Sequence, residues 1–304
     1  LKGVWAAVKQ RVNEGAPLAE ALAEHPKIFT GLYISMVRAG ETSGALDVVL
    51  DRLADFTESQ AELRSKLVGT LVYPVIMLLM ALGVTSMLFV FVIPKITKIF
   101  ESQKMALPLP TKFLIFVSKV MIDYWLVIAL VLGLVIYFGR KYIRTEKGRP
   151  KWDHFLLTVP VFGPLIRMVA ISRFCKTLGT LMASGVPLLT AFDIVKNVVQ
   201  NTVLLEVIET ARDCVKEGDS IAAPLKRSGH FPPIVTHMIG IGEKSGQLEP
   251  MLNNVAQSYE VQIDSRLRAM TSLLEPLIIV MMGVVVASIV FAILMPILQM
   301  SSAI

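Results

Sequence analysis

The chain has 304 residues, of which 54% are hydrophobic and only 18% are charged, and its mean hydropathy is +0.63. These values exclude an ordinary soluble domain of this size and indicate a membrane protein. The formal net charge of +6 does not indicate nucleic-acid binding, because no aromatic side chains are interleaved with the basic ones.

Three segments are apolar enough to cross a membrane. A bilayer core needs about 20 mostly apolar helical residues, and charge-poor runs predict transmembrane helices at residues 67–94, 120–139 and 270–298. The middle segment has the shortest uncharged run, which starts at Tyr124, so its helix has to include residues 120–122 to reach the required length. The chain is therefore predicted to be all-α and polytopic.

The basic residues beside these spans are unequally distributed. Arginines occur next to the spans on one side only, whereas the other side carries lysines alone. Because cytoplasmic loops are enriched in Lys and Arg, we predict that residues 1–66 and 140–269 are cytoplasmic and that residues 95–119 and 299–304 lie outside. The membrane-proximal charge also predicts contact with anionic lipid head groups.

An internal repeat links the two predicted cytoplasmic regions. With an offset of 202 residues, residues 29–94 align with residues 231–296 without a gap. The match indicates a duplicated unit made of a helical bundle and the span that follows it, so the first and third spans are equivalent. A middle span allows two such bundles to lie on the same side of the membrane.

The repeat contains a Gly-Glu-x-Ser-Gly motif in each copy. We expect the first glycine to end a helix, a hydroxyl to cap the next helix, and the second glycine to permit close approach of the chain. A P-loop is excluded, because the spacing in "GEKS" does not match that motif and the other copy lacks the lysine. A proline inside each span is expected to kink or end it. The repeated turn residues and prolines are Gly40, Glu41, Ser43, Gly44, Pro74, Gly242, Glu243, Ser245, Gly246 and Pro276.

Two further patterns predict local structure in both bundles. Gly15 and Gly218 follow polar residues and are expected to take the left-handed conformation after a helix. Apolar residues at three- and four-residue steps, from Leu46 to Leu67 and from Leu248 to Ile263, predict buried helix faces.

Neither a metal site nor a cofactor site is predicted. Cys175 and Cys214 fall in a predicted cytoplasmic region, where disulfides are rare, and are expected to be two buried thiols. The four histidines are scattered without metal-ligand spacing. No catalytic constellation is present in the sequence, which argues against an enzyme.

The motifs together resemble those of a known family. The paired "FTGLYISMVRAGETSGALDVVLDRLADF" and "FPPIVTHMIGIGEKSGQLEPMLNNVA", the turn "LMASGVPLLTAF", the loop "LPLPTKFL" and the ending "EPLIIVMMGVVVASIVFAILMPIL" are similar to the F protein of type II secretion systems. This family is kin to the inner-membrane core protein of type IV pilus machines. The resemblance covers essentially the whole chain. It implies a multi-pass inner-membrane assembly platform with two homologous cytoplasmic helical bundles and a short periplasmic loop and tail.

The resemblance also implies a function and a set of partners. Such a platform would link a cytoplasmic secretion ATPase to the assembly of pseudopilins, for export of folded proteins across the outer membrane. The implied partners are the ATPase, other inner-membrane components, pseudopilins and further copies of the chain. Two alternatives stay open: the platform of a type IV pilus machine and, more distantly, a small membrane transporter, although the spans carry few polar residues at mid-depth.

Four side chains are candidate contacts with partner proteins. Glu275 is an ionisable residue inside the third span, where such groups mark functional sites by default. Alternatively, it reaches the interface or bonds backbone groups freed by Pro276. Arg64, Arg266 and Arg268 precede the first and third spans and would meet either an acidic partner surface or lipid head groups.

The second bundle has an upstream segment that the first lacks. A helical hairpin is predicted there, with Gly185 at the end of one helix and Pro187 in the first turn of the next. Because the chain starts at Leu1, which aligns with Leu204, we expect the first bundle to lack about two helices and further N-terminal sequence.

Overall fold

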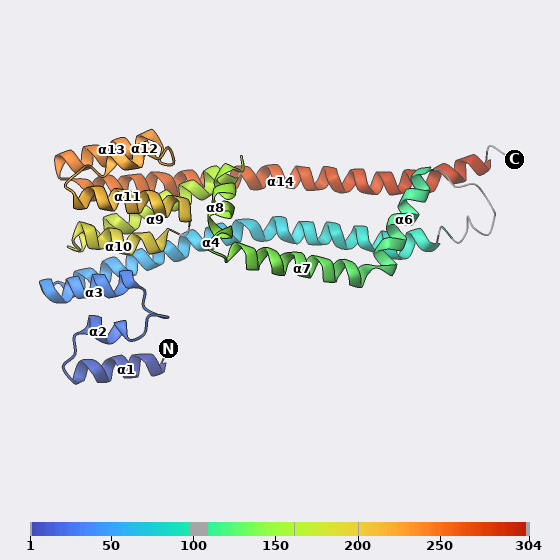
Figure 1. Ribbon diagram of the computed structural model, residues 1–304. Helices are drawn as coiled ribbons and strands as arrows, with labels where there is room; N and C mark the ends of the chain where they lie inside the picture. Colours follow the sequence, from blue (N-terminus) through green and yellow to red (C-terminus); the bar gives the residue numbers. More distant parts are fainter. Residues whose placement is uncertain (1, 96, 98–108, 161, 200, 302–304) are drawn as a thin grey trace. The chain divides into compact units, whose positions relative to one another are not determined.

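The computed structural model describes every residue except 1, 96, 98–108, 161, 200 and 302–304 (Figure 1). The described part consists of helices joined by turns and contains no strand, which confirms the predicted all-α fold. The chain forms two compact units. Unit 1 contains Leu1–Lys66 and Thr145–Arg266, and unit 2 contains Leu67–Arg144 and Leu267–Ile304.

Unit 1 contains two modules whose helices follow the same order. The helices of the first module are α1 (Lys2–Asn13), α2 (Leu18–Ala23), α3 (Gly31–Ser43) and the beginning of α4 (Leu46–Met87). Those of the second module are α11 (Thr202–Lys216), α12 (Ala222–Arg227), α13 (Pro233–Ser245) and the beginning of α14 (Leu248–Ser301). Gly15 and Gly218, at φ angles of 95° and 88°, follow α1 and α11 in the predicted left-handed conformation.

Three further helices precede the second module: α8 (Gly148–Thr158), α9 (Phe162–Ala183) and α10 (Leu188–Val198). The predicted hairpin is formed by α9 and α10, with Gly185 at a φ angle of 78° and Pro187 at the N-cap of α10. The Asp153 carboxylate of α8 accepts hydrogen bonds from the N–H and the hydroxyl of Thr202, both at 2.8 Å. These bonds tie α8 to the start of α11.

One apolar cluster includes residues of both modules and of the α9–α10 hairpin. In it the ring of Phe174 on α9 packs against Phe192 on α10 and against Phe231, which precedes α13, with centroid distances of 6.2 and 5.7 Å. Aromatic pairs at these distances add to the stabilisation from burial. The hairpin therefore supplies much of the core of the second module.

The two predicted apolar stripes are buried to different extents. In the second module all five members are buried: Leu248, Leu252, Val255, Tyr259 and Ile263. In the first module Leu53, Phe56 and Leu63 are buried, but Leu50 is 38% exposed, although its equivalent Leu252 is completely buried. Val49 is buried instead, so the packed face of α4 is rotated by about one residue relative to that of α14.

Unit 2 contains the membrane spans. Among the described residues, three helices are long and apolar enough to cross a bilayer, over Leu46–Lys95, Trp125–Ile143 and Leu248–Met295. The first and third include the parts of α4 and α14 that belong to this unit, and the second is α7 (Trp125–Ile143). The predicted polytopic membrane protein with three spans is thus supported by the structure.

The second span begins later than the sequence suggested. Residues 120–122, which we assigned to it, belong to the separate helix α6 (Leu109–Asp123), and the chain turns at Tyr124 before α7 begins. The span gains its length at the other end instead, because α7 continues beyond residue 139. The predicted loop at residues 95–119 therefore contains most of α6, and its residues 96 and 98–108 lie outside the described part.

The prolines of the spans do not end their helices. The helix α4 continues through Pro74, and α14 continues through Pro276. The helix of the first span also extends one residue beyond Pro94. Of the two expected effects, a kink or an end, these prolines therefore do not end the helix at any of the three positions.

A hydroxyl of α6 completes the hydrogen bonding of the first span near Pro94. Residues Leu88–Val92 form a π-helix, in which the N–H of Ile93 donates to the carbonyl of Leu88, five residues back. The carbonyl of Phe89 thereby loses the donor that an α-helix would supply. The buried hydroxyl of Ser118 donates to it at 2.6 Å.

A second hydroxyl of α6 has the same function in the third span. Pro296 has no N–H, so the carbonyl of Ala292 lacks its donor four residues later. The buried hydroxyl of Thr111 donates to this carbonyl at 2.6 Å. Because lipid offers no compensating hydrogen bond, both contacts matter more in a membrane than at an aqueous surface.

The repeat supplies a matched pair of variants for testing the core. Leu252→Ala should lower the free energy of unfolding by roughly 2–5 kcal/mol, because it removes a completely buried side chain. Leu50→Ala, at the equivalent but partly exposed position, should cost less than about 1 kcal/mol. Unfolding of the full chain in lipid nanodiscs, followed by tryptophan fluorescence, measures both. Equal losses would contradict the different burial of the two stripes.

Candidate functional site: the repeated turn and the paired spans

In each copy of the repeated motif, each glycine has the function that we expected of the other. The helices α3 and α13 do not end at Gly40 and Gly242 but continue to Ser43 and Ser245. The second glycine of each motif ends the helix instead, since Gly44 and Gly246 take φ angles of 72° and 71°. This left-handed conformation is one that glycine adopts without strain.

The first glycine of each motif permits close packing on the next helix. A Cβ atom on Gly40 would lie 3.1 Å from the Cα of Leu46, and one on Gly242 would lie 2.9 Å from the Cα of Leu248. Both contacts are with backbone at the start of α4 or α14, so a larger residue would push the helices apart. The close approach that we assigned to the second glycine thus belongs to the first.

The hydroxyls of the motif do not cap the following helix. Thr42 donates to the carbonyl of Arg38 and Ser43 to that of Ala39, both at 2.8 Å, while Ser245 donates to its own helix at 3.4 Å. All three bonds run backwards into the last turn of α3 or α13. These hydroxyls therefore bond within their own helix and leave the N–H groups at the start of α4 and α14 uncapped by them.

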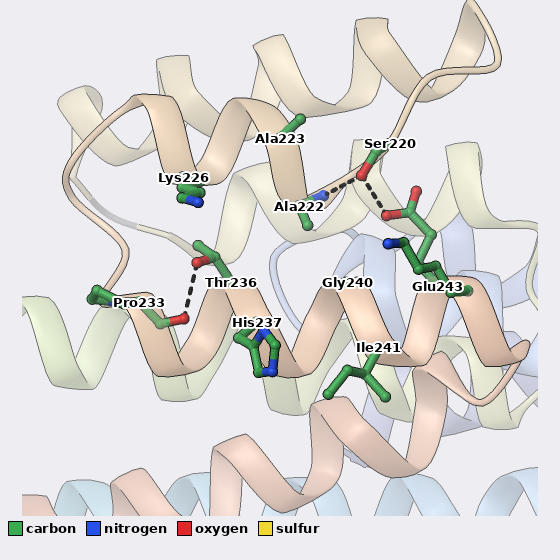
Figure 2. Close-up of a pocket in the computed structure, with 11 residues that line it drawn as sticks. Ser220, Ala222, Ala223, Lys226, Pro233, Thr236, His237, Gly240, Ile241 and Glu243 are labelled. Atoms are coloured by element: carbon green, nitrogen blue, oxygen red, sulfur yellow. Dashed lines mark hydrogen bonds between the residues drawn. The ribbon is translucent and has the colours of Figure 1, made fainter.

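The glutamate of each motif caps the short helix of its module. The Glu41 carboxylate accepts the N–H groups of Leu18 and Ala19, at 2.5 and 2.9 Å, at the start of α2. In the second module the Glu243 carboxylate accepts the N–H of Ile221 at 2.8 Å and the hydroxyl of Ser220 at 2.6 Å, next to α12 (Figure 2). Such charge-assisted bonds also gain from the positive end of the helix dipole.

This capping was not predicted, although the sequence contains a signal for it. In both copies the glutamate follows the start of a short helix by about the same number of residues, and it sits between a packing glycine and a helix-ending turn. A carboxylate that accepts two hydrogen bonds within its own module has a structural function. The motif therefore builds the module and is not a catalytic site.

The first and third spans are joined by two residues at equivalent positions of the repeat. The Tyr73 hydroxyl donates to the Glu275 carboxylate at 3.2 Å. Tyr73 and Glu275 immediately precede Pro74 and Pro276, the prolines that are identical in the two copies of the repeat. Glu275 thus has a partner within the chain, which differs from the predicted contacts with another subunit, the membrane interface or freed backbone groups.

The three candidate arginines lie on exposed helix surfaces. Arg64 is exposed on α4, and Arg266 and Arg268 are exposed on α14. Arg64 and Arg266 belong to unit 1, whereas Arg268 belongs to unit 2. Their exposure is compatible with contact to lipid or to protein, and it does not choose between the two.

The cysteines and histidines form no metal site in the described part of the chain, where no cluster of three or more potential ligands occurs. Cys175 is completely buried, and burial raises the pKa of its thiol far above the usual range. Cys214 is only partly buried, so the expectation of two buried thiols holds for one of them.

The glutamate caps can be tested with one control. Glu41→Ala and Glu243→Ala should each lower the free energy of unfolding by about 1–2 kcal/mol, the upper range for loss of a helix cap. Glu206→Ala, at an exposed position in α11, should change it by less than about 0.5 kcal/mol. Thermal unfolding of the full chain in nanodiscs compares the three. If Glu41→Ala and Glu243→Ala lowered the free energy of unfolding no more than Glu206→Ala, these hydrogen bonds would add no stability.

Comparisons with known proteins identify the family. The family model described as "Type II secretion system (T2SS), protein F" matches residues 1–94 and 174–296. The type IV pilus assembly protein PilC of Myxococcus xanthus is 38% identical over 100% of this chain and 73% of its own length, and PilC of Thermus thermophilus is 40% identical over 96% and 72%. The type II secretion system protein F of Aeromonas hydrophila is 38% identical over 99% of this chain and 78% of its own length.

These similarities confirm the resemblance found in the motifs. Together with the three apolar helices, they indicate an inner-membrane protein that belongs to a secretion or pilus machine and is not an enzyme. The chain belongs to the type II secretion system protein F family.

Proposed function

We propose that this protein is the inner-membrane assembly platform of a type II secretion system, which links a cytoplasmic ATPase to the assembly of pseudopilins for export of folded proteins. The observation that carries the proposal is the pair of matches to the family, because each covers one helical module and the span that follows it. Two similar bundles on one chain suit a scaffold that binds moving partners, and the described residues include no cluster of three or more side chains that could hold a metal ion.

The proposed topology places both modules in the cytoplasm. Residues 1–66 and 140–269 carry the arginines that flank the spans, and the positive-inside rule assigns such segments to the cytoplasm. The segment at 95–119 and the tail at 299–304 would then be periplasmic. With this topology the modules of unit 1 meet the ATPase and other inner-membrane components, while the spans meet pseudopilins and lipid. We also propose that the platform contains several copies of the chain.

A type IV pilus platform is the second candidate. The relatives support it as well as the first candidate, because two pilus assembly proteins are 38% and 40% identical to this chain and a secretion system protein F is 38% identical. The loop "LPLPTKFL" and the end of the last span support the secretion branch. In both candidates the platform has the same architecture, and the exported substrate differs.

The exposed arginines are the proposed contacts of unit 1. In the host, Arg64→Glu combined with Arg266→Glu should reduce export at least about tenfold, which corresponds to a loss of about 1.4 kcal/mol in partner binding. Photoreactive residues at Glu58, Arg64, Glu260 and Arg266 should give adducts with the ATPase or another inner-membrane component. Lys216→Glu, an exposed charge reversal on α11, is the matched control and should leave export unchanged. Adducts with lipid alone, together with normal export, would assign the arginines to the membrane surface.

Glu275 is the proposed contact within the spans, and its internal partner allows a discriminating test. If Glu275 binds another subunit, Glu275→Gln should lower export at least about tenfold, while Tyr73→Phe should leave it within about twofold. Export by the host expressing each full-length variant provides the measurement, with membrane levels of the protein as a control for folding. If both variants lowered export equally, the function of the Glu275 carboxylate would be its hydrogen bond with Tyr73 and not a contact with another subunit.

A further inference from the structure

The outer face of α13 carries an exposed apolar stripe with basic neighbours. Ile234 and Ile241 are 60% and 45% exposed and lie two helical turns apart. His237 and Lys244 continue the same face at three-residue steps and are also exposed. The stripe extends for about 15 Å at 1.5 Å per residue. Two large aliphatic side chains at helical spacing are suited to contact another helix.

A groove lies beside this stripe. It has a volume of about 510 Å³ and is bounded by α12 with its preceding turn on one side and by α13 on the other (Figure 2). Ala222 and Ala223 form the apolar part of the α12 wall, and Thr236 and Gly240 form part of the α13 wall. The small side chains on both walls leave room for a side chain from outside.

The groove is basic at its edges. Lys226 on α12 and Lys244 on α13 line it from opposite sides, and both are exposed. The carboxylate that lines it, Glu243, is already engaged by the Ser220 hydroxyl and the Ile221 N–H. An occupant with carboxylates on both edges would therefore complement the two ammonium groups.

The first module contains the matching helix face in different surroundings. Its residues Ser35, Ala39 and Thr42, which are equivalent to His237, Ile241 and Lys244, line a pocket together with the α9–α10 turn of the same chain. Leu32, the equivalent of Ile234, is 5% exposed. At three of the four matching positions the first module is thus more buried than the second, while Thr42 is exposed like Lys244.

We propose that the α12–α13 groove and its stripe form a docking site for a helical segment of a partner protein, with apolar side chains along one face and carboxylates on its edges. The proposal goes beyond the platform function and does not depend on which machine the protein serves. A flat membrane surface fits less well, because the site is concave and presents two large apolar side chains. A second copy of the α9–α10 turn is also a poor match, since the residues with which it lines the first module are Ser184, Gly185, Val186, Pro187 and Thr190, none of them acidic.

The test uses the full chain in lipid nanodiscs and two labelled helical peptides. Both peptides carry leucines at i, i+3 and i+7, and their edges carry glutamates in one and lysines in the other. Fluorescence anisotropy should show binding of the acidic peptide alone. Lys226→Glu combined with Lys244→Glu should weaken that binding at least about tenfold and create binding of the basic peptide. Ile234→Ser combined with Ile241→Ser should weaken it similarly.

Matched controls keep the result specific to the groove. Val261→Ser and Lys216→Glu replace an apolar and a basic residue that are also exposed in unit 1 but do not line the groove, and both should leave binding unchanged. No binding of the acidic peptide, equal binding of both peptides, or equal loss in the control variants would overturn the proposal. A photoreactive residue in place of Ile241 provides an independent arm in host cells. Adducts that map to lipid or to a second copy of this chain would also overturn it.

Discussion

The carboxylates of Glu41 and Glu243 fix the geometry of the two modules. Each extends from the third helix of its module to the start of a helix of only six residues, which is too short to be stable alone. The glycine before each carboxylate lets the next long helix approach the same turn within about van der Waals contact. A Gly-Glu pair therefore positions three helices at once. Because the modules are mostly helix surface around this arrangement, the surfaces that meet partners depend on it.

In unit 2 the structure depends on the lack of water in the bilayer core, where every backbone carbonyl needs a donor from the protein. Prolines and a π-helix leave carbonyls of Phe89 and Ala292 without their helical donors, and lipid cannot supply replacements. The hydroxyls of Ser118 and Thr111, both on α6, donate to these two carbonyls. The helix α6 is therefore hydrogen-bonded to the backbone of both the first and the third span. Side chains from α6 and both spans also pack in one apolar cluster. The segment between the first two spans thus has a structural function that its length alone did not reveal.

Periodicity and the repeat were enough to predict the all-α fold, the number of spans and the helix ends near Gly15, Gly185 and Gly218, because these depend on local composition. They could not assign the two glycines of the motif, since a glycine that relieves strain and a glycine that allows close packing are identical in sequence. They also could not distinguish Leu50 from Leu252, because burial depends on the neighbours that each helix finds in the folded unit. The Tyr73–Glu275 contact required knowing that two equivalent positions face each other.

Duplication explains why the same scaffold presents different chemistry at matching positions. In the spans, one copy has Tyr73 where the other has Glu275, and the tyrosine hydroxyl donates a hydrogen bond to the glutamate carboxylate. On the third helix of the modules, one copy has Ser35, Ala39 and Thr42 beside an internal turn, whereas the other has His237, Ile241 and Lys244 at the matching positions, all exposed. The residues that build the modules, Gly40 and Glu41 with their equivalents, are unchanged. Since identity is retained where it positions helices and lost where helices meet other surfaces, the second module is the one whose α13 face is adapted to a partner outside the chain.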